Sequence, residues 1–367
     1  MKAMILAAGV GSRLEPLTCN VPKPMVPVVN RPAMEHIVNL LVKNNITQVA
    51  ANLWYLPETI QSYFGDGSRF GVDLHYSVEK DLMGTAGGVK KLQSFLDETF
   101  VIISGDALTD IDLWGLIQKH QQSGAIATIA LKEVSDPSQF GVVITEADGR
   151  IKAFQEKPQP EVALSKLANT GIYVFEPAIF DLIPAATVYD FGKQLFPELV
   201  KQSAPFYGYH AQGYWCDIGS LTQYRLAQYD VLRGNVNVVI PGNWHDNGVY
   251  IGENTIVAPS ARLGAKVVIG KGCQIGAGVE IFGETVIGDY CVIGADTTVF
   301  GSVIWDQTRI GSGARLVDSI IGSGCQIHSE VQIGSGAILG DNCLVETGRV
   351  IEANAKLFPG TTTPRQG

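Results

Sequence analysis

Two different spacings of apolar residues divide the chain. Up to about residue 233, short apolar runs alternate with stretches in which apolar residues recur every three or four positions. The runs predict β-strands at residues 3–6, 48–53, 72–77 and 100–103, and the helical spacing predicts a helix at 33–44. Such alternation predicts an α/β domain with a mostly parallel, mixed sheet and helices on both faces.

From about residue 250 an aliphatic side chain stands at every sixth position, often followed by glycine. The series comprises Ile251, Val257, Leu263, Ile269, Ile275, Ile281, Ile287, Ile293 and Val299, then Ile310 and Leu316, then Ile321, Ile327, Ile333, Leu339, Val345 and Ile351. This hexapeptide repeat predicts a left-handed parallel β-helix in which three hexads, about 18 residues, form one coil. We therefore expect a first domain at 1–233, a linker at 234–248, the β-helix at 249–360 and a tail at 361–367.

Composition narrows the class of protein. The 367 residues favour two domains, and the net charge of −9 argues against a nucleic-acid partner. No apolar run reaches the ~20 residues that span a bilayer, so we expect no membrane partner and a cytoplasmic location.

The six cysteines form no CxxC pair, which argues against a zinc site. Cys273 and Cys291 are separated by one predicted coil, as are Cys325 and Cys343. Each pair is expected to stack inside the β-helix as packing.

The candidate chemistry begins where predicted strands end, since open α/β sheets bind ligands beyond the carboxyl ends of their strands. Residues 7–13 form a glycine-rich turn that lacks the third glycine of a dinucleotide fingerprint, and no P-loop motif is present. Arg13 and Lys23 supply cations that suit a polyphosphate.

Several motifs then occur in a fixed order between residues 3 and 219. They are Leu6-Ala7-Ala8-Gly9-Val10-Gly11-Ser12-Arg13-Leu14, Pro22-Lys23-Pro24, Gly84-Thr85-Ala86-Gly87, Gly105-Asp106, Glu156-Lys157-Pro158, Asn169-Thr170-Gly171 and Trp215-Cys216-Asp217-Ile218-Gly219. Together they resemble the motifs of the sugar-phosphate nucleotidyltransferases, a family with a Rossmann-like catalytic domain and often a hexapeptide tail. The resemblance implies that the substrates are a nucleoside triphosphate and a sugar 1-phosphate, and that the products are a nucleotide-diphospho-sugar and pyrophosphate.

The resemblance also assigns roles to residues. Asp106 and Asp217 are implied to be the ligands of Mg²⁺, which prefers carboxylate oxygens. The catalytic residues are expected to be Arg13, Lys23, Asp106 and Asp217. The expected nucleotide-binding residues are Leu6, Ala7, Ala8, Gly9, Gly11, Ser12, Arg13, Glu79, Gly84 and Thr85. The residues expected to bind the sugar phosphate are Gly141, Glu156, Lys157, Asn169 and Thr170.

Glu79 bears on the choice of base, because a carboxylate only accepts hydrogen bonds. Guanine offers two adjacent donors, whereas uracil and thymine offer one donor between carbonyl oxygens. Glu79 therefore favours GTP. Together with Asp190-Phe191-Gly192-Lys193 and the repeat tail, it makes the chain resemble the mannose-1-phosphate guanylyltransferases, which make GDP-mannose. UTP or dTTP with glucose 1-phosphate stays open as the alternative.

The sequence also has features of two other classes of protein. Hexapeptide β-helices also form acyltransferases, but the repeat region offers only His328 as a base. A regulatory paralogue that binds nucleotide-sugars without turnover is disfavoured, because every predicted catalytic residue is present. The open faces of a β-helix favour a homo-oligomer assembled through that domain.

Overall fold

The computed structural model describes residues 1–364, and these form two compact units. The first unit contains Met1–Gly9 and Met34–Asp217. The second contains Val10–Ala33 and the chain from Ile218 onward. The predicted division into domains along the sequence therefore stays a prediction, and residues 365–367 of the predicted tail lie outside the described residues.

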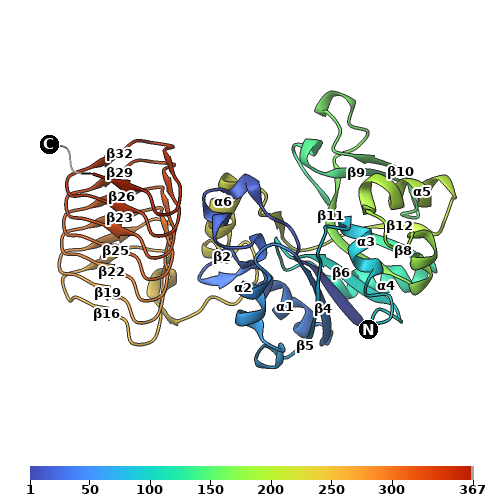
Figure 1. Cartoon of the computed structure of the whole chain (residues 1–367), viewed down its shortest axis with the longest axis horizontal. Coiled ribbons are helices and arrows are strands. Elements are labelled where there is room, and N and C mark those ends of the chain that lie inside the picture. The colour runs from blue at the N-terminus through green and yellow to red at the C-terminus, as the bar shows by residue number, and fades with distance from the viewer. Residues whose placement is uncertain (365–367) are drawn as a thin grey trace. The chain divides into compact units, whose positions relative to one another are not determined.

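A nine-stranded mixed sheet forms the centre of the first unit (Figure 1). Its strands are β1 (Lys2–Leu6), β4 (Gln48–Leu53), β5 (Asp73–Val78), β6 (Phe100–Ser104), β8 (Ala127–Glu133), β9 (Gly141–Thr145), β10 (Ile151–Glu156), β11 (Leu167–Phe175) and β12 (Phe206–His210). The main order is β10-β9-β11-β6-β1-β4-β5, and β8 pairs with β11 and β12. The pairs β1–β4, β1–β6 and β4–β5 are parallel, whereas β11 is antiparallel to its neighbours, which confirms the predicted mixed α/β fold.

All four predicted strands are present, with ends that differ by at most one residue. Their continuous apolar runs reflect burial on both faces, since Met4 and Ile102 have no exposed surface. Because β1 and β6 are parallel, their carboxyl ends meet at one edge. There the Gly105 amide donates a hydrogen bond of 2.9 Å to the Leu6 carbonyl, which places two of the sequence motifs together.

Helices connect the strands of this sheet. They are α1 (Ala33–Lys43), α2 (Pro57–Phe64), α3 (Gly84–Lys90), α4 (Leu113–Ser123) and α5 (Phe196–Lys201), with a π-helix (Phe191–Leu195) directly before α5. The predicted helix at 33–44 is thus confirmed as α1. The side chain of Asp112 caps α4 by accepting a hydrogen bond of 3.0 Å from the Gly115 amide.

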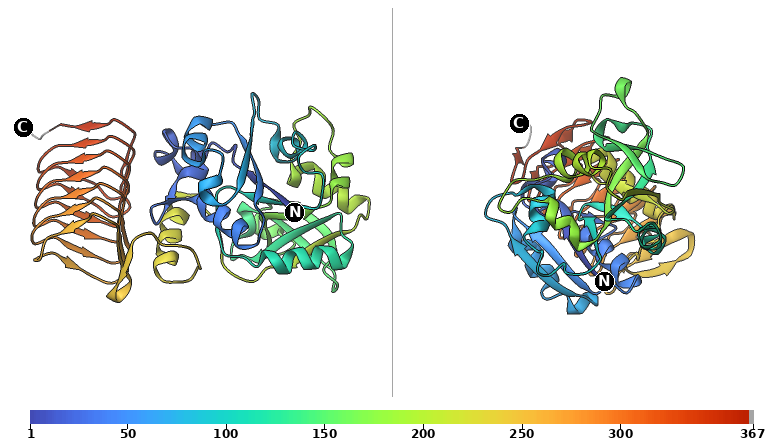
Figure 2. Two further views of the ribbon diagram at one scale, coloured as in Figure 1. Left: turned by 90° about the horizontal axis from the view of Figure 1, so that it is seen from below. Right: turned by 90° about the vertical axis from the view of Figure 1, so that its right-hand side faces the viewer.

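The second unit contains α6 (Leu221–Leu232), the short strands β2 (Pro27–Val28) and β3 (Arg31–Pro32), and a left-handed β-helix of three sheets. The strands of successive coils pair in parallel, and the coils are visible in Figure 2. The first sheet comprises β14 (Asn243–His245), β15 (Val249–Ile251), β18 (Val267–Ile269), β21 (Thr285–Ile287), β24 (Val303–Ile304), β27 (Ile320–Ile321), β30 (Ile338–Leu339) and β33 (Lys356–Leu357). The second comprises β16 (Ile256–Val257), β19 (Gln274–Ile275), β22 (Val292–Ile293), β25 (Arg309–Ile310), β28 (Gln326–Ile327), β31 (Leu344–Val345) and β34 (Thr362–Thr363). The third comprises β17 (Arg262–Leu263), β20 (Glu280–Phe282), β23 (Thr298–Phe300), β26 (Arg315–Val317), β29 (Gln332–Ile333) and β32 (Val350–Ile351).

Strand structure extends into both segments that flank the predicted β-helix. Strand β14 lies in the predicted linker and is antiparallel to β15, and β34 lies in the predicted tail. The hexad pattern did not predict β14, because this strand runs antiparallel to β15 and does not belong to a repeating coil.

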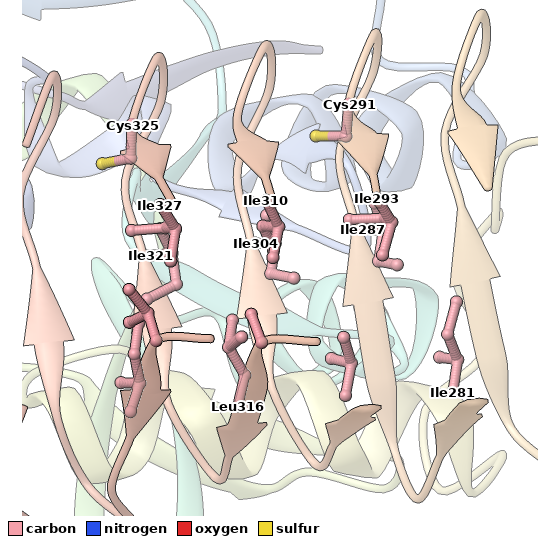
Figure 3. Close-up of a cluster of buried hydrophobic side chains, with 14 of the residues drawn as sticks. Ile281, Ile287, Cys291, Ile293, Ile304, Ile310, Leu316, Ile321, Cys325 and Ile327 are labelled. Carbon is pink, nitrogen blue, oxygen red and sulfur yellow. The ribbon is translucent and has the colours of Figure 1, made fainter. Parts of the chain in front are cut away.

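The predicted inward residues form the core of the β-helix. Ile287 pairs in register with Ile269 on one coil and Ile304 on the next, and all three are fully buried. Figure 3 shows Ile287, Ile304 and Ile321 in successive coils, and it also shows Cys291 and Cys325 of the same buried cluster. The thiols of Cys273, Cys291, Cys325 and Cys343 are all buried in this cluster.

Two coils are shorter than the predicted length. Val286 pairs with Val303, and Val303 with Ile320, so each of these coils takes one residue fewer than the 18 that separate Val268 from Val286. Ile304, which the hexad series omitted, therefore points into the core. At the shortened corner the buried hydroxyls of Ser302 and Ser319 lie 3.2 Å apart and bond to each other.

Replacing Ile287 by alanine is expected to destabilise the β-helix by about 2–5 kcal/mol, because it leaves a cavity between closely packed coils. The change should lower the urea midpoint of unfolding, followed by circular dichroism. Ile256→Ala is the matched control, since Ile256 is 67% exposed. Equal midpoints for the two variants would contradict the packing described here.

No helix within residues 1–364 has the length and apolar character needed to cross a bilayer.

Candidate active site

Asp106 and Asp217 come from adjacent backbone positions at the end of a small second sheet. In this sheet β7 (Ala107–Thr109) is antiparallel to β13 (Trp215–Asp217), and Asp217 is paired with Ala107. Asp106 directly precedes Ala107, so strand pairing brings together two carboxylates that are far apart in the sequence.

A cavity of about 180 Å³ is lined by both carboxylates. The five residues predicted to bind the sugar phosphate line the same cavity. They come from different parts of the main sheet, namely the start of β9 (Gly141), the end of β10 (Glu156), the residue after it (Lys157) and the middle of β11 (Asn169 and Thr170). The fold thus brings the predicted metal ligands and the predicted sugar-phosphate-binding residues to one cavity.

Glu156 is held at the cavity by glycines. A Cβ atom on Gly141 would lie 2.9 Å from Oε2 of Glu156, and one on Gly192 would lie closer still. Although the side chain as a whole is exposed, its carboxylate is partly desolvated by these contacts. This desolvation raises the pKa of Glu156, the Asp190 carboxylate raises it further, and Lys157 opposes the shift.

Asn169 and Thr170 are oriented by hydrogen bonds to the backbone. Oδ1 of Asn169 accepts a bond of 3.0 Å from the Gly171 amide. The Thr170 hydroxyl donates a bond of 2.8 Å to the Ala130 carbonyl, and the Thr170 carbonyl accepts one of 2.9 Å from Nε1 of Trp215. These bonds fix the wall of the cavity before any ligand binds.

Glu79 lies in a buried hydrogen-bond network and not on the surface, since only 4% of it is exposed. Its Oε1 accepts a bond of 2.8 Å from the Asn52 amide, and its Oε2 accepts one of 3.0 Å from the Met83 amide. Oδ1 of Asn52 in turn accepts a bond of 3.1 Å from the Ala7 amide. Glu79 therefore ties the start of the glycine-rich turn to the segment before α3.

Gly84 and Thr85 lie at the start of α3, where they contact the segment before the π-helix. The Thr85 amide and hydroxyl donate to Oδ1 of Asp190 at 3.2 and 3.3 Å. Gly84 has a φ of +72°, and a Cβ atom there would lie 2.8 Å from the Tyr189 carbonyl oxygen. Glycine is required at this position by both conformation and space.

Gly11, Ser12, Arg13 and Lys23 belong to the second unit, whereas Leu6, Ala7, Ala8 and Gly9 belong to the first. Arg13 is exposed within a short 3₁₀ turn (Ser12–Leu14), and Lys23 is half-buried. Gly11 has a φ of +77°, and a Cβ atom there would lie 2.8 Å from Cβ of Lys23. Glycine thus allows this turn to pack closely against Lys23.

The carboxylates of Asp106 and Asp217 suit a metal ion whose remaining ligands are phosphate oxygens of the substrate and water. Within residues 1–364 no group of three or more His, Cys, Asp or Glu side chains is arranged to hold a metal. Mg²⁺ is commonly bound by one or two carboxylates and completes its octahedron with phosphate oxygens and water. Asp106 and Asp217, which line the same cavity, meet that requirement.

Comparison with known protein families agrees with this geometry. Residues 2–234 match the model of the family described as nucleotidyl transferase. The chain belongs to the nucleotidyl transferase family. Residues 246–351 of this nucleotidyl transferase match a second model, the left-handed β-helix domain of the EIF2B epsilon subunit. Both the resemblance and the fold class predicted from the sequence are confirmed.

Individual relatives cover most of this nucleotidyl transferase. It is 42% identical over 337 residues to UTP–glucose-1-phosphate uridylyltransferase of Synechocystis sp., with 88% of this chain and 87% of the relative covered. It is 34% identical over 269 residues to mannose-1-phosphate guanyltransferase beta-B of Xenopus laevis, with 72% and 73% covered. A solved structure of a glucose-1-phosphate thymidylyltransferase from Bacillus anthracis, described as putative and complexed with sucrose, aligns with a TM-score of 0.59 and 27% identity over 65% of this chain and 97% of the other.

Sequence reasoning missed several residues of the site. Trp215 and Ser104 line the cavity, and the Ser104 hydroxyl donates a hydrogen bond to Oδ1 of Asp106. Trp215 precedes Asp217 by two positions in one strand, so the period of two could have placed both side chains on one face. Asn52 lies near the carboxyl end of β4, where the rule for open sheets could have identified it.

Proposed function

We propose that the protein transfers a nucleotidyl group from a nucleoside triphosphate to a sugar 1-phosphate. The supporting observation is the shared cavity of Asp106, Asp217 and the five sugar-phosphate candidates. A phosphate oxygen of the sugar attacks the α-phosphorus in line, and the bond from that phosphorus to the β-bridging oxygen breaks. Pyrophosphate leaves with the electron pair. The nucleophile is already an anion at neutral pH, so no general base is required.

The protein's part in this reaction is then to position and neutralise anions. We assign Arg13 and Lys23 to the phosphates of the nucleotide and Lys157 to the phosphate of the sugar. Glu156 and Asn169 are assigned to sugar hydroxyls, because together they offer both acceptors and a donor. Mg²⁺ bound by Asp106 and Asp217 would supply positive charge at the reacting phosphate.

For the substrates we propose UTP and glucose 1-phosphate. The relative with 42% identity over 88% of the chain is a uridylyltransferase for glucose 1-phosphate. The argument for guanine depended on an available Glu79 carboxylate, and both of its oxygens already accept bonds from Asn52 and Met83. GTP with mannose 1-phosphate is the second candidate, supported by guanyltransferase relatives at 34% identity.

Glu79→Gln separates these two candidates. A glutamine has one acceptor oxygen, so its amide nitrogen would face either the Asn52 or the Met83 donor. We expect a loss of stability of about 1–3 kcal/mol with unchanged preference among bases. The exposed Glu133→Gln is the control for the loss of charge. A changed base preference at unchanged stability would support direct contact with guanine.

The function is tested by pyrophosphate release with Mg²⁺ over a grid of substrates. The grid crosses UTP, dTTP, GTP, ATP and CTP with the 1-phosphates of glucose, mannose and N-acetylglucosamine. Release mainly with UTP and glucose 1-phosphate is expected. Release only with GTP and mannose 1-phosphate would select the second candidate, and no release from folded protein would contradict the proposed reaction.

The acyltransferase hypothesis rests on a single histidine in the β-helix. Nδ1 of His328, the only histidine considered as an acyltransferase base, lies 3.0 Å from Oε2 of Glu346 on the next coil. A homo-oligomer formed through the β-helix stays a prediction, to be tested by light scattering.

A further inference from the structure

Ser104 is the last residue of β6, and strands on both sides hold its backbone in place. On one side Ser104 pairs in register with Leu6 of the parallel strand β1. On the other side Ile103, which directly precedes it, pairs with Ile172 of the antiparallel strand β11. The backbone at Ser104 is therefore fixed by the centre of the main sheet.

The side chain of Ser104 contributes to the wall of the cavity that Asp106 and Asp217 line. Gly171 of β11 lies against it, since a Cβ atom on Gly171 would lie 3.1 Å from Cβ of Ser104. Gly171 also has a φ of +77°, so both its conformation and this contact favour glycine. The close approach restricts the space that is available to the Ser104 side chain.

A hydrogen bond connects this fixed residue to the carboxylate of Asp106. The Ser104 hydroxyl donates to Oδ1 of Asp106 across Gly105, which separates the two residues in the chain. Ser104 ends a central strand, whereas Asp106 lies in the turn between β6 and β7. A bond from a hydroxyl to an ionised carboxylate is roughly twice as strong as one between neutral groups. The bond therefore extends the order of the sheet to a carboxylate in a turn.

The orientation of a carboxylate affects how well it binds a metal ion. Mg²⁺ requires its oxygen ligands at nearly ideal octahedral positions. A side chain that rotates freely loses conformational entropy when a metal fixes it, and a side chain that is already held loses less. Carboxylates that ligate metals are accordingly hydrogen-bonded by neighbouring groups, and the loss of such a neighbour lowers metal affinity.

We propose that Ser104 is a positioning residue for Asp106, because its hydroxyl holds the carboxylate in the orientation that binds the metal ion. This role rests on the proposed function, in which Asp106 is a ligand of Mg²⁺. Ser104 acts through Asp106 and makes no contact of its own with the metal or the substrates.

Ser104→Ala tests this role in turnover assays. Removal of the hydroxyl should raise the Mg²⁺ concentration that gives half the maximal rate by about 10- to 100-fold. Saturating Mg²⁺ should restore most of the rate, and the KM for the sugar 1-phosphate should stay unchanged. A higher KM for the sugar 1-phosphate with unchanged dependence on Mg²⁺ would mean that Ser104 contacts the sugar phosphate, and would overturn the proposal.

Ser123→Ala is the matched control. Ser123 is a half-buried serine at the end of α4 and does not line the cavity. Its hydroxyl donates bonds of 2.8 and 3.0 Å to the carbonyls of Lys119 and His120, so this substitution also removes a bonded hydroxyl. The control should keep the Mg²⁺ dependence of the wild-type protein. An equal shift in both variants would show a general effect of losing a hydroxyl, and no positioning of Asp106.

Metal binding is measured separately from turnover, with Mn²⁺ as the probe. Water-proton relaxation reports Mn²⁺ bound to the protein in the presence of UTP and, in parallel, of GTP. Ser104→Ala should weaken Mn²⁺ binding by the same factor as it shifts the Mg²⁺ dependence. In an Asp106→Ala background it should have no further effect, because a residue that acts through Asp106 then has nothing to position. A further loss in that background would overturn the proposal.

Asp106→Ala by itself separates the role of Ser104 from the identity of the metal ligand. If Asp106→Ala weakens Mn²⁺ binding and Ser104→Ala does not, the positioning role is refuted and the proposed reaction is unaffected. If Asp106→Ala binds Mn²⁺ as the wild-type protein does, Asp106 is not a ligand and both assignments fail.

Discussion

Replacing Asp217 by asparagine is expected to lower kcat by at least about 100-fold. The substitution keeps the size of the side chain and removes one of the two carboxylates proposed to bind Mg²⁺. The positive charge that stabilises the reacting phosphate would then be lost or misplaced. Pyrophosphate release at increasing Mg²⁺ concentration is the measurement, and partial recovery at high Mg²⁺ is expected because the ligand set is weakened.

The control for Asp217→Asn is Asp181→Asn, which removes an exposed carboxylate that does not line the cavity. Circular dichroism should show that both variants keep the wild-type fold. A rate for Asp217→Asn close to that of the control would remove Asp217 from the metal site. The same result for Asp106→Asn would refute the carboxylate pair as a whole.

Replacing Lys157 by methionine is expected to lower kcat/KM for the sugar 1-phosphate by about 10- to 100-fold. Lys157 lines the cavity beside Glu156, and its loss removes one charge-assisted contact to phosphate, which contributes about 1.5–3 kcal/mol. Methionine keeps the length of the side chain, so packing changes little. The KM for the nucleotide should change by less than about twofold.

Lys152→Met is the matched control for this prediction. Lys152 is an exposed lysine of β10, the strand that ends at Glu156, and it does not line the cavity. Both substitutions remove one positive charge from the protein. If the two variants have the same kinetics, Lys157 does not bind the sugar phosphate.

Local patterns predicted most of the fold. The central strands β1, β4 and β6 follow from apolar runs of a few residues, since these strands are buried along most of their length. The β-helix follows from the hexads because every coil repeats the same inward position. The motifs also predicted which residues line the cavity, since Asp106, Glu156, Lys157, Asn169 and Asp217 meet there.

The same patterns could not predict hydrogen-bond or strand-pairing partners that come from distant segments of the chain. No pattern in the sequence indicated that the Asn52 side-chain amide and the Met83 backbone amide donate to the two carboxylate oxygens of Glu79. The hexads passed over Ile304, because a coil one residue shorter keeps its register only through pairing with neighbouring coils.

The sequence by itself thus determined the two kinds of fold, the family and several of the residues that line the cavity of Asp106 and Asp217. It could do so because periodicity and motifs are properties of contiguous residues. Only the tertiary structure decided that Val10–Ala33 groups with the β-helix, where Nδ2 of Asn30 donates a hydrogen bond to the Ile287 carbonyl. That arrangement depends on hydrogen bonds and burial between segments hundreds of residues apart, which leave no period in the sequence.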